Sequence, residues 1–285
     1  MLEAVRVELA GRQPLLRRDV RVCAADAGWL VLDARRLLFA GPLDLAAIVA
    51  LAHAAAAEQT EVALVTPEDV NVAAYLQRMD VVRRMPAGIE IEGSLPDEQR
   101  TDRSRVLLEV SAMSAVTVDG LVNRLGRMIS EHFAGAVAGL VFRGVGELID
   151  NAVSHGDSRI GAFVAAQSYT GATSGRPGFE FAVCDTGIGV LDHLRGNPKY
   201  ALVPDAQTAL ACAIQPGVTG TSEPRGYGLA DLLQITRGGG VGRLVLRSGN
   251  GIASVALRRQ SRRDAYAAAT PPIMGTWAWL RVRFP

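Results

Sequence analysis

Two polar side chains with catalytic potential, Glu147 and Asn151, stand four positions apart within the largely apolar segment 145–152. Residues with this spacing project from one face of a helix, and the apolar residues between them would form its buried stripe. A carboxylate above a carboxamide can pair a general base with a neutral oxygen ligand for Mg²⁺, which otherwise keeps water or phosphate. Taken alone, the spacing is more typical of a solvated helix face.

A second candidate is Asp185, which follows the apolar run 181–184 and opens a turn that contains Gly187 and Gly189. A carboxylate delivered into such a turn suits the recognition of an exocyclic amine. The carboxylate accepts the hydrogen bond of the amine, and glycines let backbone approach a planar ring. An ordinary strand-ending turn has a similar composition, so this signal is also incomplete by itself.

The third candidate is the loop 217–229, which is rich in glycine and threonine and precedes a helix predicted at 229–236. Backbone N–H groups at a helix N-terminus can face an anion. Gly226 and Gly228 permit close approach of a phosphate, and Arg225 can bind phosphate oxygens in a fork. A flexible surface loop is the alternative interpretation.

In their order and spacing, the three segments resemble the boxes of the GHKL (Bergerat-fold) ATPase family. That family includes gyrase B subunits, MutL, the large heat-shock chaperones, histidine kinases and anti-sigma serine kinases. Segment 147–151 is similar to the N box, 185–189 to the G1 box and 226–229 to the G2 box. Gly275-Thr276, followed by Phe284-Pro285, is similar to the Gly-Thr step that closes these domains. The resemblance covers roughly residues 119–285.

The resemblance implies an α/β sandwich, with a mixed and mainly antiparallel sheet under helices, that binds ATP and Mg²⁺. Glu147 would be the catalytic base, Asn151 the metal ligand, and Asp185 the acceptor for the adenine amine, with Thr276 nearby. The residues expected to bind the nucleotide are Asn151, His155, Asp185, Gly187, Gly189, Thr219, Arg225, Gly226, Tyr227, Gly228, Leu229 and Thr276. Two roles stay open for His155: it could lie beside the phosphates, or it could cap the end of the helix.

Hydrophobic periodicity predicts the elements that would position the first two candidates. A helical pattern runs from 106 to 155, with one break between 116 and 119 and another near 134–135. The run 181–184 is typical of a buried strand, and 206–214 of a helix.

The C-terminal segment is predicted to be β-rich. A hairpin is expected around Asn250-Gly251, with strands at 243–246 and 253–257. A last strand is expected at 277–284, and the polar, alanine-rich segment 258–272 as an excursion between two strands.

The N-terminal part, residues 20–93, alternates short β-rich runs with helical patterns, which predicts a small α/β layer. Its second helix should begin at the turn Pro67-Glu68-Asp69. We therefore expect an α/β (α+β) chain with an α/β domain at 1–95, a linker and the start of a helical segment at 96–118, and the nucleotide-binding domain at 119–285.

More loosely, the N-terminal part resembles STAS domains, the fold of anti-sigma-factor antagonists, through Leu32-Asp33, segment 39–42, Val65-Thr66-Pro67 and segment 75–79. Antagonists carry a phosphorylatable serine at the start of the first helix, where segment 41–45 reads Gly-Pro-Leu-Asp-Leu and has no hydroxyl. The resemblance therefore implies a docking or dimerisation module.

Composition excludes several other classes. The formal net charge of +1 gives no global field toward nucleic acid or an anionic membrane. Lys199 is the only lysine, and its polar surroundings fit neither a P-loop nor Schiff-base chemistry. The longest uncharged apolar run, 133–142, is about half a membrane span. The N-terminus lacks the pattern of a signal peptide, so we expect a soluble cytoplasmic protein that binds neither membrane nor nucleic acid.

Several functions compete within the GHKL resemblance. A sensor histidine kinase would need a phosphoacceptor, and the one candidate, His132, lacks the sequence context usual for it. A gyrase- or MutL-type machine would need a transducer domain, which is not expected in a chain ending at Pro285. We therefore expect an ATP-binding regulatory protein of the anti-sigma type, either a Ser/Thr protein kinase or an ATPase. A non-catalytic, nucleotide-gated interaction module is the alternative. The expected partners are ATP, a STAS-type or other regulatory protein and, as an open alternative, a second copy of the chain.

Overall fold

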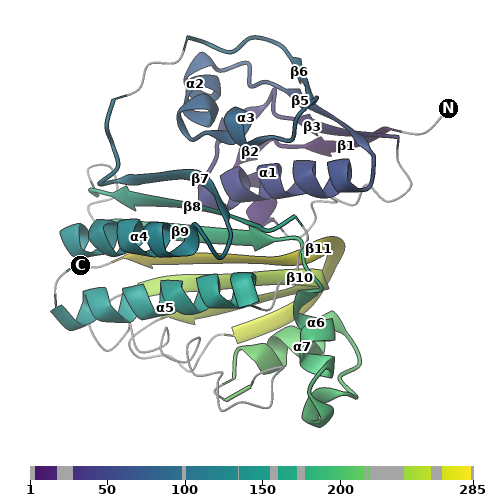
Figure 1. Cartoon of the computed structure of the whole chain (residues 1–285), viewed down its shortest axis with the longest axis vertical. Coiled ribbons are helices and arrows are strands. Elements are labelled where there is room, and N and C mark those ends of the chain that lie inside the picture. Colours follow the sequence, from purple (N-terminus) through teal and green to yellow (C-terminus); the bar gives the residue numbers. More distant parts are fainter. Residues whose placement is uncertain are drawn as a thin grey trace.

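The described residues fold into a mixed α/β structure with a four-stranded parallel sheet, a five-stranded antiparallel sheet and a short two-stranded parallel sheet (Figure 1). The computed structural model describes residues 4–17, 28–97, 101–133, 135–154, 160–171, 177–215, 217–218, 241–257 and 265–283. The α/β class expected from the sequence is thus confirmed. None of the described helices is long and apolar enough to cross a membrane.

The parallel sheet is formed by the N-terminal part of the chain. Its four strands, in the order β1-β3-β5-β6, are Ala4–Glu8, Trp29–Asp33, Glu61–Val65 and Glu90–Glu92. The elements beside them are the short β2 (Gly11–Arg12) and β4 (Leu37–Phe39), the 3₁₀ turn η1 (Pro14–Leu16), and the helices α1 (Pro42–Ala57), α2 (Val70–Arg78) and α3 (Val81–Arg84). Asp69 caps α2 by accepting hydrogen bonds from the backbone N–H groups of Asn71 and Val72. The predicted start of that helix is confirmed.

The antiparallel sheet has the order β10-β11-β9-β8-β7. Its strands are β7 (Leu107–Met113), β8 (Ala162–Tyr169), β9 (Gly178–Asp185), β10 (Val241–Leu257) and β11 (Ala265–Arg283). Its helices are α4 (Val118–His132), α5 (Gly135–Ser154), α6 (Gly189–Arg195) and α7 (Ala206–Ala213), with a 3₁₀ turn η2 at Pro198–Tyr200. Apolar stripes of α4 and α5 cover one face of this sheet, where they pack against Phe179, Phe181 and Val183 of β9. The expected break near 134–135 separates these two helices and is confirmed.

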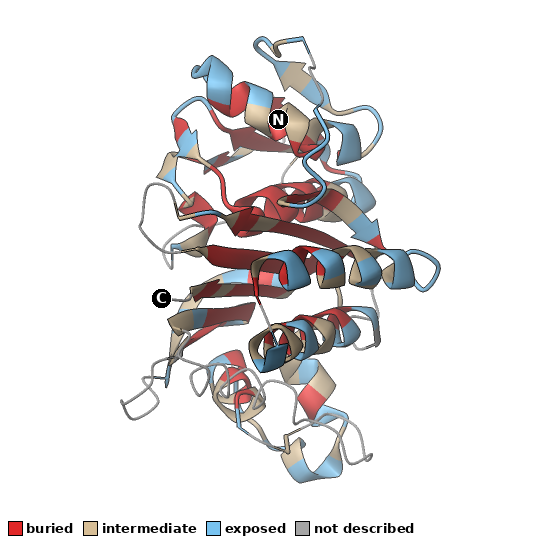
Figure 2. Ribbon diagram, turned by 90° about the vertical axis from the view of Figure 1, so that its left-hand side faces the viewer, coloured by how far each residue is buried: buried red, intermediate tan, exposed pale blue. Residues whose placement is uncertain are grey.

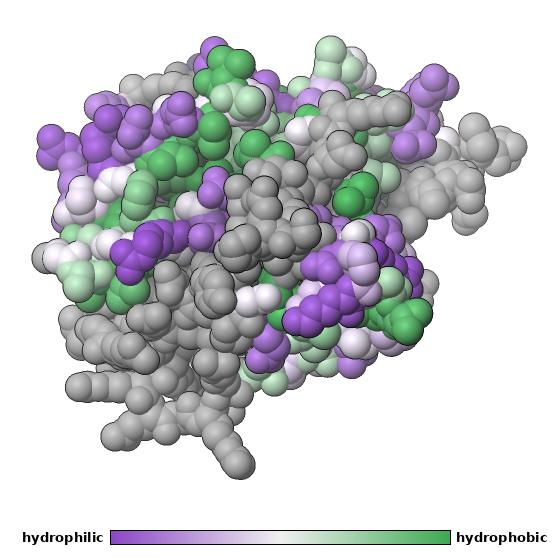
Figure 3. All heavy atoms as spheres, turned by 60° about the horizontal axis from the view of Figure 1, so that its bottom comes forward, coloured by the Kyte–Doolittle hydropathy of each residue, from purple (hydrophilic) through white to green (hydrophobic). Residues whose placement is uncertain are grey.

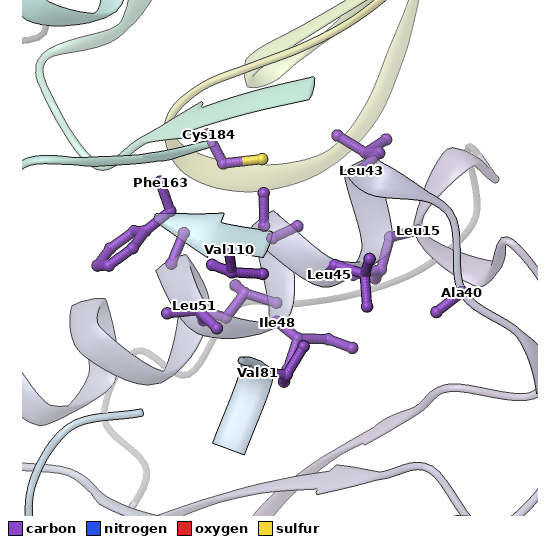
Figure 4. Close-up of a cluster of buried hydrophobic side chains, with 14 of the residues drawn as sticks. Leu15, Ala40, Leu43, Leu45, Ile48, Leu51, Val81, Val110, Phe163 and Cys184 are labelled. Carbon is purple, nitrogen blue, oxygen red and sulfur yellow. The ribbon is translucent and has the colours of Figure 1, made fainter. Parts of the chain in front are cut away.

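The opposite face of the antiparallel sheet is covered by α1, which lies between the two sheets (Figure 1). Its sequence is apolar on all sides, and a helix of this kind is stable only when it is surrounded. Leu45 and Ile48 share one buried cluster with Phe163 and Cys184 of the antiparallel sheet and with Val81 of α3 (Figure 4). Figure 2 shows the buried residues concentrated in the strands of both sheets and in the helix between them. One core therefore joins the two sheets.

The edge strand β7 corrects the helical pattern expected from residue 106. It pairs with β8 on one side, and on the other the Val110 N–H donates to the Met79 carbonyl. Its Glu109 binds two arginines, Arg78 of α2 at 2.6 Å and Arg124 of α4 at 2.5 Å. Pairing with β8, together with this bond to the turn between α2 and α3, overrides the local helical pattern, and Glu109 ties β7 to α2 and α4.

The hairpin predicted at Asn250-Gly251 is also wrong. β10 runs through this point as one strand, with register shifts at Ser248/Gly249 and Gly249/Gly251, and 265–272 forms the first part of β11 instead of an excursion. A Cβ on Gly251 would lie 2.9 Å from the backbone of Ala206 in α7. The glycine is therefore required for close packing of a helix and not for a turn.

Removal of side-chain volume from α1 should destabilise both sheets together. We expect Ile48→Ala, at a fully buried position, to lower the free energy of unfolding by about 2–5 kcal/mol in a single transition. Val70→Ala, at a position that is 60% exposed, is the control and should change it by less than about 0.5 kcal/mol. Trp29 reports on the parallel sheet, and Trp277 with Trp279 on the antiparallel sheet, in denaturant titrations followed by fluorescence. Separate transitions for the two sets of tryptophans would contradict the shared core.

Candidate functional site

Asp185 is a buried carboxyl group at the end of β9, with 5% of its surface exposed. Its Oδ1 accepts two backbone hydrogen bonds, from the N–H of Gly187 at 2.9 Å and from the N–H of Thr276 at 3.2 Å. Burial raises the pKa of Asp185 to about 6, and the two hydrogen bonds act in the opposite direction. Both of these bonds end on the same oxygen, Oδ1.

Close approach of β11 to the end of β9 places Thr276 at this carboxyl group. Gly275 has a φ of +71°, and a Cβ at this position would overlap the carbonyl of Asp185. Gly189, with a φ of +78°, begins α6 where a Cβ would lie 2.9 Å from the Ser248 Oγ. Both glycines are therefore required by geometry: Gly275 lies against the backbone of Asp185, and Gly189 lies against the side chain of Ser248.

Ser248 joins these segments and was not singled out in the sequence. Its Oγ accepts a hydrogen bond from the Val190 N–H at 2.9 Å, donates to the Gly275 carbonyl at 2.9 Å and lies 3.2 Å from the Thr276 Oγ1. A weak signal was present, because Ser248 follows Leu244 and Leu246 in the alternating row that faces the core of the antiparallel sheet. A polar residue in such a row needs partners.

Glu147 and Asn151 lie on α5, as expected from their spacing. Val145, Leu148 and Ile149 are buried against the sheet, while Glu147 is half-buried and Asn151 is exposed. α5 ends at Ser154, and β8 begins shortly afterwards at Ala162, which pairs directly with Asp185. The end of α5 lies at the edge of the sheet where β9 runs into α6 (Figure 1).

The structure therefore brings Asp185, Gly187, Gly189 and Thr276 together at one edge, with the end of α5 directed toward it. The remaining expected ligand residues lie outside the described residues: His155, Thr219, Arg225, Gly226, Tyr227, Gly228 and Leu229. Their roles stay predictions. Figure 3 turns the lower side of Figure 1 forward, and both hydrophilic and hydrophobic residues are exposed among the described atoms of this face.

At the start of α1, Asp44 occupies the region where the STAS resemblance would place a phosphorylatable serine. Asp44 is fully buried, and its two oxygens accept the N–H groups of Leu15 at 2.8 Å and Gly41 at 2.9 Å. Burial raises its pKa to about 7. The role of Asp44 is structural, because it caps α1 and attaches the preceding segment to it.

Compared with known proteins, the sequence matches no family model and no curated protein at a significant level. Function is therefore argued from the geometry of this edge.

Substitution of Gly275 tests the close approach of β11 to β9. Gly275→Ala combines a positive φ with overlap on the Asp185 backbone, whereas Gly88→Ala has a φ of +82° and open space around it. We expect the Gly88 variant to lose about 1 kcal/mol of unfolding free energy and the Gly275 variant clearly more. Thermal and denaturant unfolding measure both. Equal losses would contradict the close contact.

Titration of Asp185 should give a defined pH dependence of stability. Its native pKa of about 6 exceeds the ordinary value of 3.8, so the native state holds a proton that the unfolded state has lost. The stabilisation is complete below about pH 4 and falls as the pH rises through 6, by up to about 3 kcal/mol. Asp185→Asn should lack this decrease.

Asp205 is the matched control for that measurement. It caps α7 by accepting the Thr208 N–H, and this bond lowers its pKa. Asp205→Asn should therefore remove a contribution of opposite sign, one that is present at neutral pH and lost in acid. If Asp185→Asn left the pH dependence of the unfolding free energy between pH 4 and 7 unchanged, Asp185 would not titrate in that range as a buried acid.

Proposed function

We propose that the chain is an ATP-binding regulatory protein of the GHKL type. It binds ATP with Mg²⁺ at the edge of the antiparallel sheet where β9 ends. The observation that carries the proposal is Asp185, a buried carboxyl group held through Oδ1 by the N–H groups of Gly187 and Thr276. A fixed acceptor at a strand end, surrounded by glycine backbone, suits the exocyclic amine of adenine.

The side chains on α5 fit the phosphate end of such a ligand. Mg²⁺ is commonly held by one or two protein oxygens together with phosphate oxygens. The exposed carboxamide of Asn151 supplies one such oxygen, and within the described ranges no three His, Cys, Asp or Glu side chains gather to hold a metal ion by themselves. The metal would neutralise phosphate charge. Glu147, one helical turn before Asn151, would orient or deprotonate the attacking water or hydroxyl.

The acceptor of the phosphoryl group is a protein partner or water. A serine or threonine of a STAS-type or other regulatory protein would make the chain an anti-sigma-like kinase, and water would make it an ATPase. The parallel sheet, which covers the antiparallel sheet through α1, would serve as the docking module for that partner. Measurable turnover of ATP would distinguish a kinase or an ATPase from the alternative, a non-catalytic interaction module gated by nucleotide.

Calorimetry with ATP, with and without Mg²⁺, tests the proposal. We expect Mg²⁺-dependent binding in the parent protein, at least about tenfold weaker binding for Asp185→Asn, and loss of the Mg²⁺ dependence for Asn151→Ala. Asp205→Asn and Asn71→Ala, which change an exposed N-cap and an exposed helical asparagine elsewhere, should bind like the parent.

Turnover is the second readout. Glu147→Ala should keep ATP affinity and lose phosphoryl transfer by about a hundred- to ten-thousand-fold. Absence of ATP binding in the parent, or equal affinity with and without Mg²⁺, would overturn the proposal.

A further inference from the structure

Ser248 is almost completely buried, with 1% of its surface exposed, and it lies opposite Thr276 in the register of β10 and β11. A buried hydroxyl can satisfy its surroundings both by donating and by accepting. Here the Oγ donates to the Gly275 carbonyl and accepts from the Val190 N–H, both at 2.9 Å. One side chain of β10 therefore binds the backbone of β11 and of α6.

The two segments held by Ser248 are the same two that bind Asp185. Thr276, which donates to Asp185, directly follows Gly275. Gly187, which also donates to Asp185, lies three residues before Val190. Movement of either segment would change the direction in which the carboxylate points. The described hydrogen bonds of Ser248 go to Val190, Gly275 and Thr276 and not to Asp185, so it acts through these neighbours.

We infer that Ser248 is a positioning residue of the proposed nucleotide site, where its hydroxyl fixes Thr276 and the start of α6 so that Asp185 presents one carboxylate oxygen to the adenine amine. This inference rests on the proposed function. It adds a residue of β10 to a site otherwise proposed at α5, the end of β9 and β11. Space around the Oγ is limited, because a Cβ on Gly189 would lie 2.9 Å from it.

Loss of the hydroxyl should be visible without any nucleotide. Ser248→Ala leaves the Val190 N–H and the Gly275 carbonyl without this partner and loosens the Thr276 N–H bond to Asp185. The pKa of Asp185 should therefore rise above its value in the parent, because a hydrogen bond that favours the ionised form is weakened. Carboxyl ¹³C NMR titration of the nucleotide-free protein measures this pKa directly.

Ser254→Ala is the matched control. Ser254 lies on the same strand, is 2% exposed and accepts a hydrogen bond from the Arg243 Nε at 2.8 Å. It has a similar burial and no described contact with Asp185, Thr276 or α6. The control should leave the pKa of Asp185 unchanged even if it lowers stability.

The second readout is discrimination between ATP and purine riboside triphosphate, which lacks the exocyclic amine. In the parent, ATP should bind about tenfold more tightly than this analogue, and Ser248→Ala should remove most of that preference. Ser254→Ala should retain it. If Ser248→Ala does not fold, Ser248→Cys, which replaces the hydroxyl by a larger thiol that forms weaker hydrogen bonds, carries the same two measurements.

The outcomes separate the inference from the proposed function. If the parent prefers ATP but Ser248→Ala leaves either the pKa of Asp185 or the preference unchanged, the inference is overturned and the function stands. If the pKa of Asp185 shifts but the parent does not bind ATP, Ser248 positions Asp185 for another purpose. The proposed function and the nucleotide role of Ser248 are then both overturned.

Discussion

A carboxyl group can be buried at the end of a strand only if backbone donors reach it, and Asp185 meets this condition through two segments from different parts of the chain. The Gly187 N–H comes from the turn that follows β9, and the Thr276 N–H comes from β11, 91 residues away in sequence. β11 can approach so closely because Gly275 has no side chain. Ser248 then holds β11 and α6 together from the neighbouring strand. The arrangement of this edge follows from satisfying one buried carboxyl group.

The second constraint is α1, which is apolar on every side and therefore needs a surface on every side. The parallel sheet supplies one surface, and the face of the antiparallel sheet that α4 and α5 leave uncovered supplies the other. A polar link reinforces this packing, because Glu109 of β7 binds Arg78 of α2 and Arg124 of α4. α4 leads directly into α5, which carries Glu147 and Asn151. Contacts therefore run from α2 through β7 and α4 to α5.

The local sequence pattern predicts those elements that bury one face of a helix or one short apolar run of a strand. The apolar run 181–184 lies in β9, the stripe of Val145, Leu148 and Ile149 faces the sheet on α5, and Asp69 begins α2. β7 was not predicted, because its partners are β8 and the α2–α3 turn and its own sequence does not alternate strictly. Asn250-Gly251 has the composition of a turn, but the reason for the glycine, the backbone of α7, is remote in sequence.

The same distinction holds for the candidate site. Asp185, Gly187, Gly189 and Thr276 stand out by residue type and position, whereas Ser248 is a single serine whose importance depends on contacts with β11 and α6. A structure of the protein with a non-hydrolysable ATP analogue and Mg²⁺ tests the central claim most directly. The account predicts the adenine amine within hydrogen-bonding distance of the Asp185 carboxylate, with the Asn151 carboxamide on the metal. A nucleotide bound elsewhere, or adenine turned away from Asp185, would contradict it.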